Sequence, residues 1–137
     1  MSDIDLHRHI EACAAATVDA GFKIHRDVGP GLLESVYEAF LADQLANRGY
    51  HVERQVAVSA TYDGLTVANA FRVDLLIEGR LVVEIKSLER LAPVHSKQLL
   101  TYLRLMKQPL GLLLNFGGAT FREGIRRMVN DHRLPTA

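Results

Sequence analysis

Cysteine is almost absent from this sequence, since Cys13 is the only one in 137 residues. A disulfide framework is thereby excluded, and a reducing cytoplasm is the expected compartment. Ten Gly and four Pro are too few for a long disordered or collagen-like segment. The longest apolar stretches, such as "LGLLLNF", are too short to span a bilayer. The opening also lacks the basic start and apolar run of a signal peptide. We therefore expect a cytoplasmic protein without a membrane partner.

Charge of one sign is not in excess, because 16 Lys and Arg balance 16 Asp and Glu. Net charge therefore makes no case for nucleic acid. The distribution is uneven, however: residues 1–69 hold 5 basic and 10 acidic side chains, whereas residues 70–137 hold 11 and 6. This asymmetry is either scatter over solvated faces or a locally basic face that follows phosphates.

Length and hydrophobic periodicity predict one α/β domain over 1–137, with an α+β mixed sheet flanked by helices. Helical spacing is found over 4–26 and 31–48, with the break "VGPG" between them. From residue 51 the period changes to two, and Asp63-Gly64 is typical of a hairpin turn. The predicted order is α-α-β-β-β-α-β-α, and the later elements are strands at 65–77, 81–87 and 111–116 and helices at 92–107 and 120–131.

The most strand-like segment, "FRVDLLIEGRLVVEIKS" at 71–87, contains Asp74, Glu84 and Lys86. If residues 78–80 form a three-residue loop, Asp74 stands directly opposite Glu84. The same register gathers the apolar side chains of both strands on one face, so the hydrophobic pattern favours it. A two-residue loop would place the two carboxylates on opposite faces.

Directly opposed side chains in a sheet have Cβ atoms roughly 4.5–5.5 Å apart, and like charges at that spacing repel. A hard divalent cation with oxygen ligands, Mg²⁺ or Mn²⁺, would relieve the repulsion between Asp74 and Glu84. Lys86 lies two residues beyond Glu84 on the same face and reaches the same pocket. Such a group is suited to attack by water on a phosphodiester. The alternative is a solvated hairpin face with mixed charges.

Two motifs carry a resemblance to a known family. The D-x9-E-x-K spacing from Asp74 to Lys86 resembles the PD-(D/E)XK nuclease superfamily, which has a restriction-endonuclease-like core. "GLLESVY" matches G-x-x-E-x-x-Y through Gly31, Glu34 and Tyr37. It is similar to the bacterial GxxExxY proteins, a group named for that motif and placed within the superfamily. The stretches "ERQV" and "VHSKQLLTYL" extend the resemblance over about residues 18–118.

The resemblance implies a metal-dependent phosphodiesterase that acts on nucleic acid, DNA more than RNA. Asp74, Glu84 and the carbonyl of Ile85 would bind Mg²⁺ or Mn²⁺. Lys86 would orient or deprotonate the attacking water, or offset charge on the phosphate. Glu34 would bind a second metal or a metal-bound water. From the residues alone, the favoured explanation of Glu34 is a first-turn carboxylate that the helix dipole stabilises.

"QLLTY" places Gln98 and Tyr102 one helical turn apart, and resembles the Q-x-x-x-Y motif of RecB-like nucleases. The resemblance implies that both residues position substrate. A half-buried Tyr beside a surface Gln is the alternative. The candidates for phosphate contacts, each of which fits a solvated helix face equally well, are Arg90, Lys97, Arg104 and Lys107.

Two other functions remain open at this point. The chain could be a catalytically silent nuclease-fold module that binds nucleic acid or a protein partner. It could also be an assembly protein whose apolar faces form a homodimer. A nuclease of this size has little surface for reading sequence, so we expect low sequence specificity or reliance on a dimer or a partner.

Overall fold

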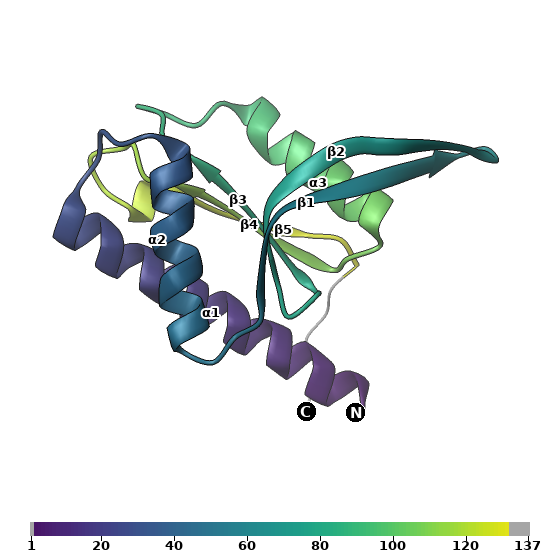
Figure 1. The fold of residues 1–137 in the computed structure, drawn as a ribbon, viewed down its shortest axis with the longest axis horizontal. Helices are drawn as coiled ribbons and strands as arrows, with labels where there is room; N and C mark the ends of the chain where they lie inside the picture. The colour runs from purple at the N-terminus through teal and green to yellow at the C-terminus, as the bar shows by residue number, and fades with distance from the viewer. Residues whose placement is uncertain (1, 132–137) are drawn as a thin grey trace.

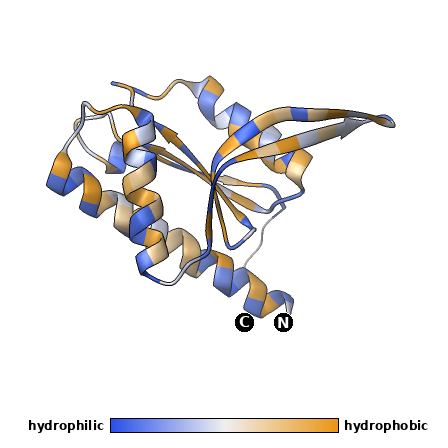
Figure 2. Ribbon diagram, in the orientation of Figure 1, coloured by the Kyte–Doolittle hydropathy of each residue, from blue (hydrophilic) through white to orange (hydrophobic). Residues whose placement is uncertain are grey.

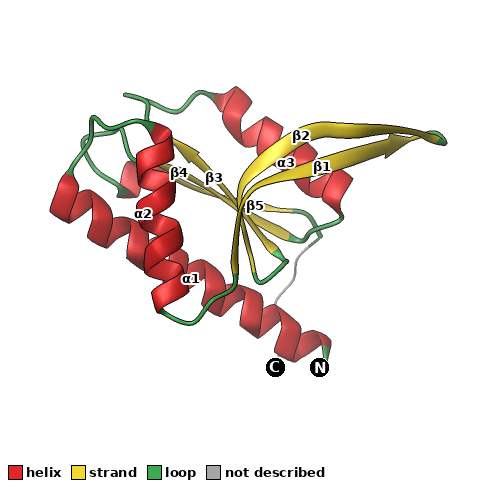
Figure 3. Ribbon diagram, viewed as in Figure 1, coloured by secondary structure: helices red, strands yellow, loops and turns green. Residues whose placement is uncertain are grey.

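The computed structural model describes residues 2–131 and consists of α-helices around a five-stranded sheet (Figures 1 and 3). The elements are α1 (Asp3–Val28), α2 (Glu34–Asn47), β1 (Val52–Tyr62), β2 (Leu65–Ile77), β3 (Leu81–Lys86), α3 (Pro93–Met106), β4 (Leu110–Asn115), the 3₁₀ turn η1 (Arg122–Gly124) and β5 (Ile125–Val129). The strands lie in the order β1-β2-β3-β4-β5, with β3 and β4 parallel and the other neighbours antiparallel. The expected mixed sheet flanked by helices is confirmed.

The helix predicted over 120–131 is wrong. This segment forms η1 and then β5, which pairs antiparallel with β4. Ile125 and Met128 have helical spacing, but they pack against the two different cores on either side of the sheet. A Cβ on Gly124 would lie 2.5 Å from the Asn115 carbonyl oxygen, so the chain passes very close to β4 there. Pairing with the open edge of β4 therefore overrides the local helical pattern.

Two hydrophobic cores cover the two faces of the sheet. The larger one joins α1 and α2 to one face, through residues such as Leu41 and Leu114. The smaller one joins α3 to the other face, through Leu99, Leu103 and Leu113. β3 and β4 are buried on both faces, and most of their residues are apolar (Figure 2); the polar exceptions are Glu84, Lys86 and Asn115.

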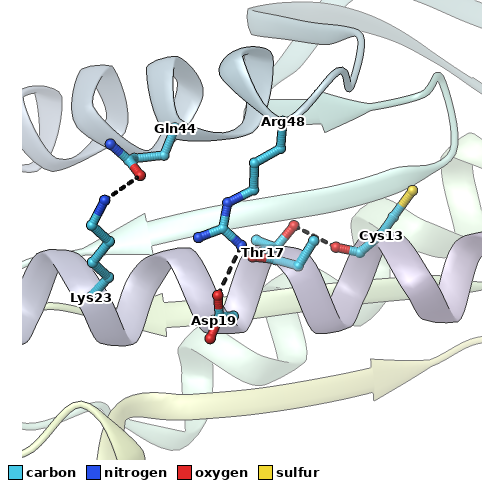
Figure 4. Close-up of polar contacts among 7 residues, drawn as sticks. Cys13, Thr17, Asp19, Lys23, Gln44 and Arg48 are labelled. Carbon is cyan, nitrogen blue, oxygen red and sulfur yellow. Dashed lines mark hydrogen bonds and ion pairs between the residues drawn. The ribbon is translucent and has the colours of Figure 1, made fainter.

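Polar contacts fix α2 on α1 (Figure 4). Arg48 binds Asp19 at 2.9 Å, and the Lys23 ammonium donates to Gln44 at 3.2 Å. Within α1, the Thr17 hydroxyl donates to the Cys13 carbonyl at 2.7 Å. Cys13 is a buried free thiol, and burial raises its pKa to about 11. Among residues 2–131, no helix has the length and apolar character needed to cross a membrane.

The distal parts of β1 and β2, residues 57–70, form an arm that projects beyond the rest of the molecule (Figure 1). Its tip is the predicted Asp63-Gly64 turn, in which both residues have a positive φ, 49° and 81°. One face of the arm is apolar, because Tyr62 pairs with Leu65 and Ala60 with Val67. Tyr62 and Leu65 are 84% and 68% exposed.

Candidate active site

The β2–β3 hairpin has the predicted register. Ile77 pairs with Leu81, and the ladder continues inward to Leu75 and Val83. Glu78 and Gly79 turn the chain with φ values of 54° and 67°, and the Arg80 N–H donates to the Ile77 carbonyl at 3.0 Å. The pairing ends at Leu75 and Val83, and the side chain of Asp74, the preceding residue of β2, interacts with that of Glu84.

Asp74 lies where β2 separates from β3. Its Oδ2 accepts a hydrogen bond from the Ile85 N–H at 2.7 Å, in place of a backbone partner. The N–H and C=O of one strand residue point to the same edge. The Ile85 carbonyl therefore also points toward β2 and the Asp74 carboxylate. The Asp74 carboxylate oxygens and the Ile85 carbonyl oxygen therefore lie close together at the edge of β3.

The apolar side chains of β2 do not all share one face, contrary to expectation. Leu75 belongs to the core under α1 and α2, whereas Val73 belongs to the core under α3. β1 changes faces at the same level, since Val52 packs on the first core and Val56 on the second. Asp74 stands at this change of face, and so it is accessible from the side that α2 covers.

Glu84 is the buried member of the carboxylate pair. Its side chain is on the α3 side of the sheet, and the residue is only 7% exposed. Burial raises the pKa of Glu84 to about 9, with hydrogen bonding to Asp74 and its negative charge adding to the rise. The positive charge of Lys86, two residues further along β3, opposes that rise in the pKa of Glu84. Glu84 Oε1 is buried and has no hydrogen-bond partner among the described residues.

Tyr102 faces the same pair from α3. Its ring stacks on Phe71 with centroids 4.1 Å apart and an interplanar angle of 10°. Burial raises the pKa of Tyr102, and the charges of Glu84 and Asp74 raise it further. Gln98 lies one turn earlier on α3 and is exposed. The structure thus brings Tyr102 to the carboxylates and leaves Gln98 in solvent.

The G-x-x-E-x-x-Y motif forms a clamped loop before α2. Tyr37 is fully buried, and its hydroxyl donates to the Gly29 carbonyl at 2.6 Å and accepts from the Leu32 N–H at 3.1 Å. The Ser87 hydroxyl, just beyond β3, donates to the Leu32 carbonyl at 2.6 Å. These bonds tie the loop to the end of β3. As a result, Glu34, the first residue of α2, is held on the site's side of the sheet.

Glu34 and Asp74 line one cleft of about 630 Å³. Its other polar lining residues are Ser35, Glu38, Gln55 and Ser87. Glu84 and Lys86 do not line it, because they lie on the α3 side of the sheet. Asp74 therefore connects the two parts of the predicted site. It lines the cleft together with Glu34, and it interacts with Glu84 at the point where β2 separates from β3.

Sequence reasoning missed two polar residues of this cleft. Glu38 is 5% exposed, and its Oε2 binds the Arg54 Nε and Nη2 at 3.0 Å each. Gln55 donates from Nε2 to Glu38 Oε1 at 2.5 Å and to Asp74 Oδ1 at 3.1 Å. The available signal for Glu38 was its spacing of one helical turn from Glu34. A strand pattern alone gave no such signal for Gln55.

A third residue, Asn115 at the end of β4, shapes the segment after Lys86. Its side chain accepts from the Leu88 N–H at 2.9 Å and donates to the Leu88 carbonyl at 2.8 Å. A Cβ on Gly117 would lie 2.4 Å from the Leu88 backbone, so the two segments are in close contact. These contacts fix the path of the chain directly after β3.

Within residues 2–131, no contact gathers the predicted phosphate-binding residues into one patch. Arg90, Lys97, Arg104 and Lys107 are all exposed. Arg90 lines a separate pocket of about 320 Å³ with Asn115 and Arg126. Lys97 and Arg104 lie on α3 itself.

The donor chemistry of the site fits a hard divalent cation. Asp74, Glu84 and the Ile85 carbonyl offer oxygen alone, and Glu84 Oε1 has no hydrogen-bond partner in the part of the chain that the structure describes. Within residues 2–131, no three His, Cys, Asp or Glu side chains are grouped closely enough to hold a metal by themselves. Mg²⁺ suits such a place, because it binds through one or two carboxylates and keeps several waters.

Comparison with known proteins identifies the class. A family model described as the PD-(D/E)XK nuclease superfamily matches residues 11–128. The chain belongs to this superfamily, and its mixed sheet between helices is consistent with the restriction-endonuclease-like fold. Nucleases of this superfamily generally use divalent metals. No curated protein matches the chain.

Proposed function

We propose that this protein is a Mg²⁺- or Mn²⁺-dependent nuclease that hydrolyses phosphodiester bonds of nucleic acid. The observation that carries the proposal is the pairing of Asp74 with a buried Glu84 whose Oε1 has no hydrogen-bond partner within residues 2–131. Two carboxyl groups placed side by side, one of them buried, are unfavourable unless a cation joins them. A structural role alone would be served better by an apolar pair.

The chain's own residues supply the remaining parts of hydrolysis. Asp74, Glu84 and the Ile85 carbonyl would hold the cation, which stabilises negative charge that develops on the phosphate. Lys86, beside Glu84, would orient or deprotonate the attacking water. Glu34 would hold a water or a second cation across the cleft from Asp74. Tyr102 would contact the substrate from α3, with Gln98 on the preceding turn.

The narrower assignment to the GxxExxY proteins is supported by the clamped loop. Gly31 has a φ of 113°, a conformation that favours glycine. The Tyr37 hydroxyl makes two backbone hydrogen bonds within that loop. Each fixed letter of the motif therefore has a physical role, since Gly31 turns the chain, Tyr37 holds the turn, and Glu34 faces the cleft.

The proposed substrate is DNA more than RNA, cut with low sequence specificity. Among the described residues, the cleft lining has no Lys or Arg, and its amide, Gln55, already donates to Glu38 and Asp74 and so is not available to read a base. The exposed basic residues Arg90, Lys97, Arg104 and Lys107 would contact phosphates, which carry no sequence information. A single sharp cleavage position on random DNA would refute low specificity.

The test is cleavage of single-stranded, duplex and supercoiled DNA and of RNA, with Mg²⁺, Mn²⁺ or EDTA. Asp74→Ala and Lys86→Ala should abolish cleavage, since the first removes a cation ligand and the second the group beside Glu84. The matched control is Lys23→Ala, an exposed lysine on α1 that contacts Gln44 away from the cleft. Cleavage in EDTA, or by both site variants at the wild-type rate, would refute the proposal.

A second candidate function is favoured by the arm, residues 57–70. On this hypothesis the chain is a catalytically silent module, and its partner is a second copy of itself. No Lys or Arg occurs between Arg54 and Arg72, so the arm has no means of contacting phosphates through basic side chains. Its exposed apolar face, by contrast, is complementary to the same face of another copy across a two-fold axis.

Sedimentation of the full chain tests this second candidate. Wild-type protein should form a dimer at micromolar concentration, and the Tyr62→Lys, Leu65→Lys double variant should be monomeric. Thr61→Lys, on the opposite face of the arm, is the control. A monomeric wild type would exclude the homodimer. Metal-dependent cleavage would exclude the silent module.

A further inference from the structure

Gln55 occupies an unusual backbone conformation for a residue inside a strand. Its φ is 49°, in the left-handed region that side chains other than glycine rarely adopt. Its neighbours keep the ladder: Arg54 pairs with Leu75, and Val56 with Val73. The left-handed residue therefore stands opposite Asp74, at the level where β1 and β2 change faces.

The left-handed turn directs the Gln55 side chain into the cleft, between two carboxylates. Its Nε2 donates to Glu38 Oε1 at 2.5 Å and to Asp74 Oδ1 at 3.1 Å. Both neighbours are acceptors, so the nitrogen of the amide must face them. Because an amide nitrogen has two hydrogens, its donor capacity is fully used by this pair.

Glu38 is anchored on its other oxygen. Its Oε2 accepts from Arg54 at 3.0 Å, so both of its oxygens are engaged by β1. This leaves Glu38 poorly suited to bind a cation, although it lines the same cleft as Glu34. A chain of contacts thus runs from Arg54 through Glu38 and Gln55 to Asp74, and from Asp74 Oδ2 to the Ile85 N–H.

We propose that Gln55 is a positioning residue for the metal site: its amide, held by Glu38, fixes the Asp74 carboxylate for the cation. The inference rests on the proposed function, because it gives Gln55 a role toward the cation that Asp74 and Glu84 would hold. Asp74 is fixed at both oxygens, by Gln55 and by the Ile85 N–H. The two hydrogen bonds fix the orientation of the Asp74 carboxylate, so the lone pairs that remain for a cation point in a constant direction.

An uncharged donor is the chemistry this position requires. A Lys or Arg between Glu38 and Asp74 would neutralise the carboxylates and compete with a divalent cation for them. The Gln55 amide orients Asp74 and leaves its charge intact. The strained φ is consistent with this role, because strain of this kind persists where the surrounding structure holds a functional side chain in place.

The experiment measures Mn²⁺ binding to the full chain by electron paramagnetic resonance, with the melting temperature of each metal-free variant recorded alongside. Gln55→Met keeps the side-chain length and removes the amide. Gln55→Gly also removes the amide but relieves the left-handed strain, so it is the variant best able to fold. The matched control is Gln108→Met, since Gln108 also donates its amide, to the Gly79 carbonyl at 3.3 Å, outside the cleft.

Both Gln55 variants should bind Mn²⁺ roughly 10–100-fold more weakly than wild type, the usual effect of removing a hydrogen-bond partner of a metal ligand. The Gly variant should bind Mn²⁺ more weakly while its melting temperature does not fall to a matching extent. If Gln55 had a purely structural role, weaker binding would be accompanied by a lower melting temperature. Binding within twofold of wild type in both variants, while Asp74→Ala has lost it, would overturn the inference alone. A wild type without Asp74-dependent Mn²⁺ binding would overturn the proposed function, and this inference with it.

Discussion

Replacing Glu84 by Gln should stabilise the metal-free protein at neutral pH. The ordinary pKa of this carboxyl is 4.5, and burial together with Asp74 raises it to about 9 in the fold. Between these values the folded chain keeps a proton that the unfolded chain has lost. The free energy of unfolding must therefore fall as pH rises from about 4.5 to about 9.

The size of the effect follows from the number of pH units between the ordinary pKa of the carboxyl and pH 7. At about 1.4 kcal/mol for each pH unit, the span from 4.5 to pH 7 corresponds to about 3 kcal/mol. Gln carries no titrating proton and has the shape of the protonated carboxyl, so Glu84→Gln removes this penalty. The variant and the wild type should be nearly equal at pH 4.5 and differ by up to about 3 kcal/mol at pH 7.

Urea unfolding in EDTA, followed by far-UV circular dichroism because the chain has no Trp, measures this difference at pH 5, 6, 7 and 8. Asp74→Asn is the control, because Asp74 already accepts from Ile85 and Gln55, and an amide cannot keep both bonds. It should destabilise the fold by about 1–2 kcal/mol. A constant gap between wild type and Glu84→Gln across this range would refute the raised pKa.

Three further predictions concern the framework of the site. Tyr37→Phe should lower the free energy of unfolding by about 1–2 kcal/mol, measured in urea, because the hydroxyl bonds Gly29 and Leu32; an unchanged midpoint would exclude the clamp. Asn115→Ala should cost about 2 kcal/mol or more in the same assay, since the Leu88 N–H and C=O lose their partner; a loss below about 0.5 kcal/mol would contradict this. Mn²⁺ at about 100 times its dissociation constant should add about 2.7 kcal/mol of stability to wild type and none to Asp74→Ala; equal stabilisation of both would place the cation elsewhere.

Much of the fold was predictable because its signals are local. The Asp63-Gly64 turn and the loop at 78–80 fix two hairpins, and the alternation of β2 and β3 then fixes their register. That register predicted Asp74 close to Glu84 from sequence alone, but it did not predict the change of face that places Asp74 in the cleft with Glu34. The final strand β5 was not predictable in this way, because its pairing depends on the open edge of β4, which is remote in sequence from the signals of a hairpin.

The rest of the site depends on contacts that no single segment specifies. Gln55 reaches the cleft because of a left-handed backbone conformation within β1, which the strand pattern does not predict. Glu38 is held in the cleft by its ion pair with Arg54. The change of face at Gln55 and Asp74 also breaks the assumption that a strand keeps one apolar side throughout. A strand that crosses from one core to another can be recognised only once both cores are in place.

The most direct test of the central claim is the position of a cation in crystals grown with Mn²⁺, found from its anomalous X-ray scattering. We predict a peak within bonding distance of the Asp74 and Glu84 carboxylates and the Ile85 carbonyl, on the edge of β3. No peak there, with Mn²⁺ present at millimolar concentration, would contradict the metal-dependent nuclease proposed for this chain.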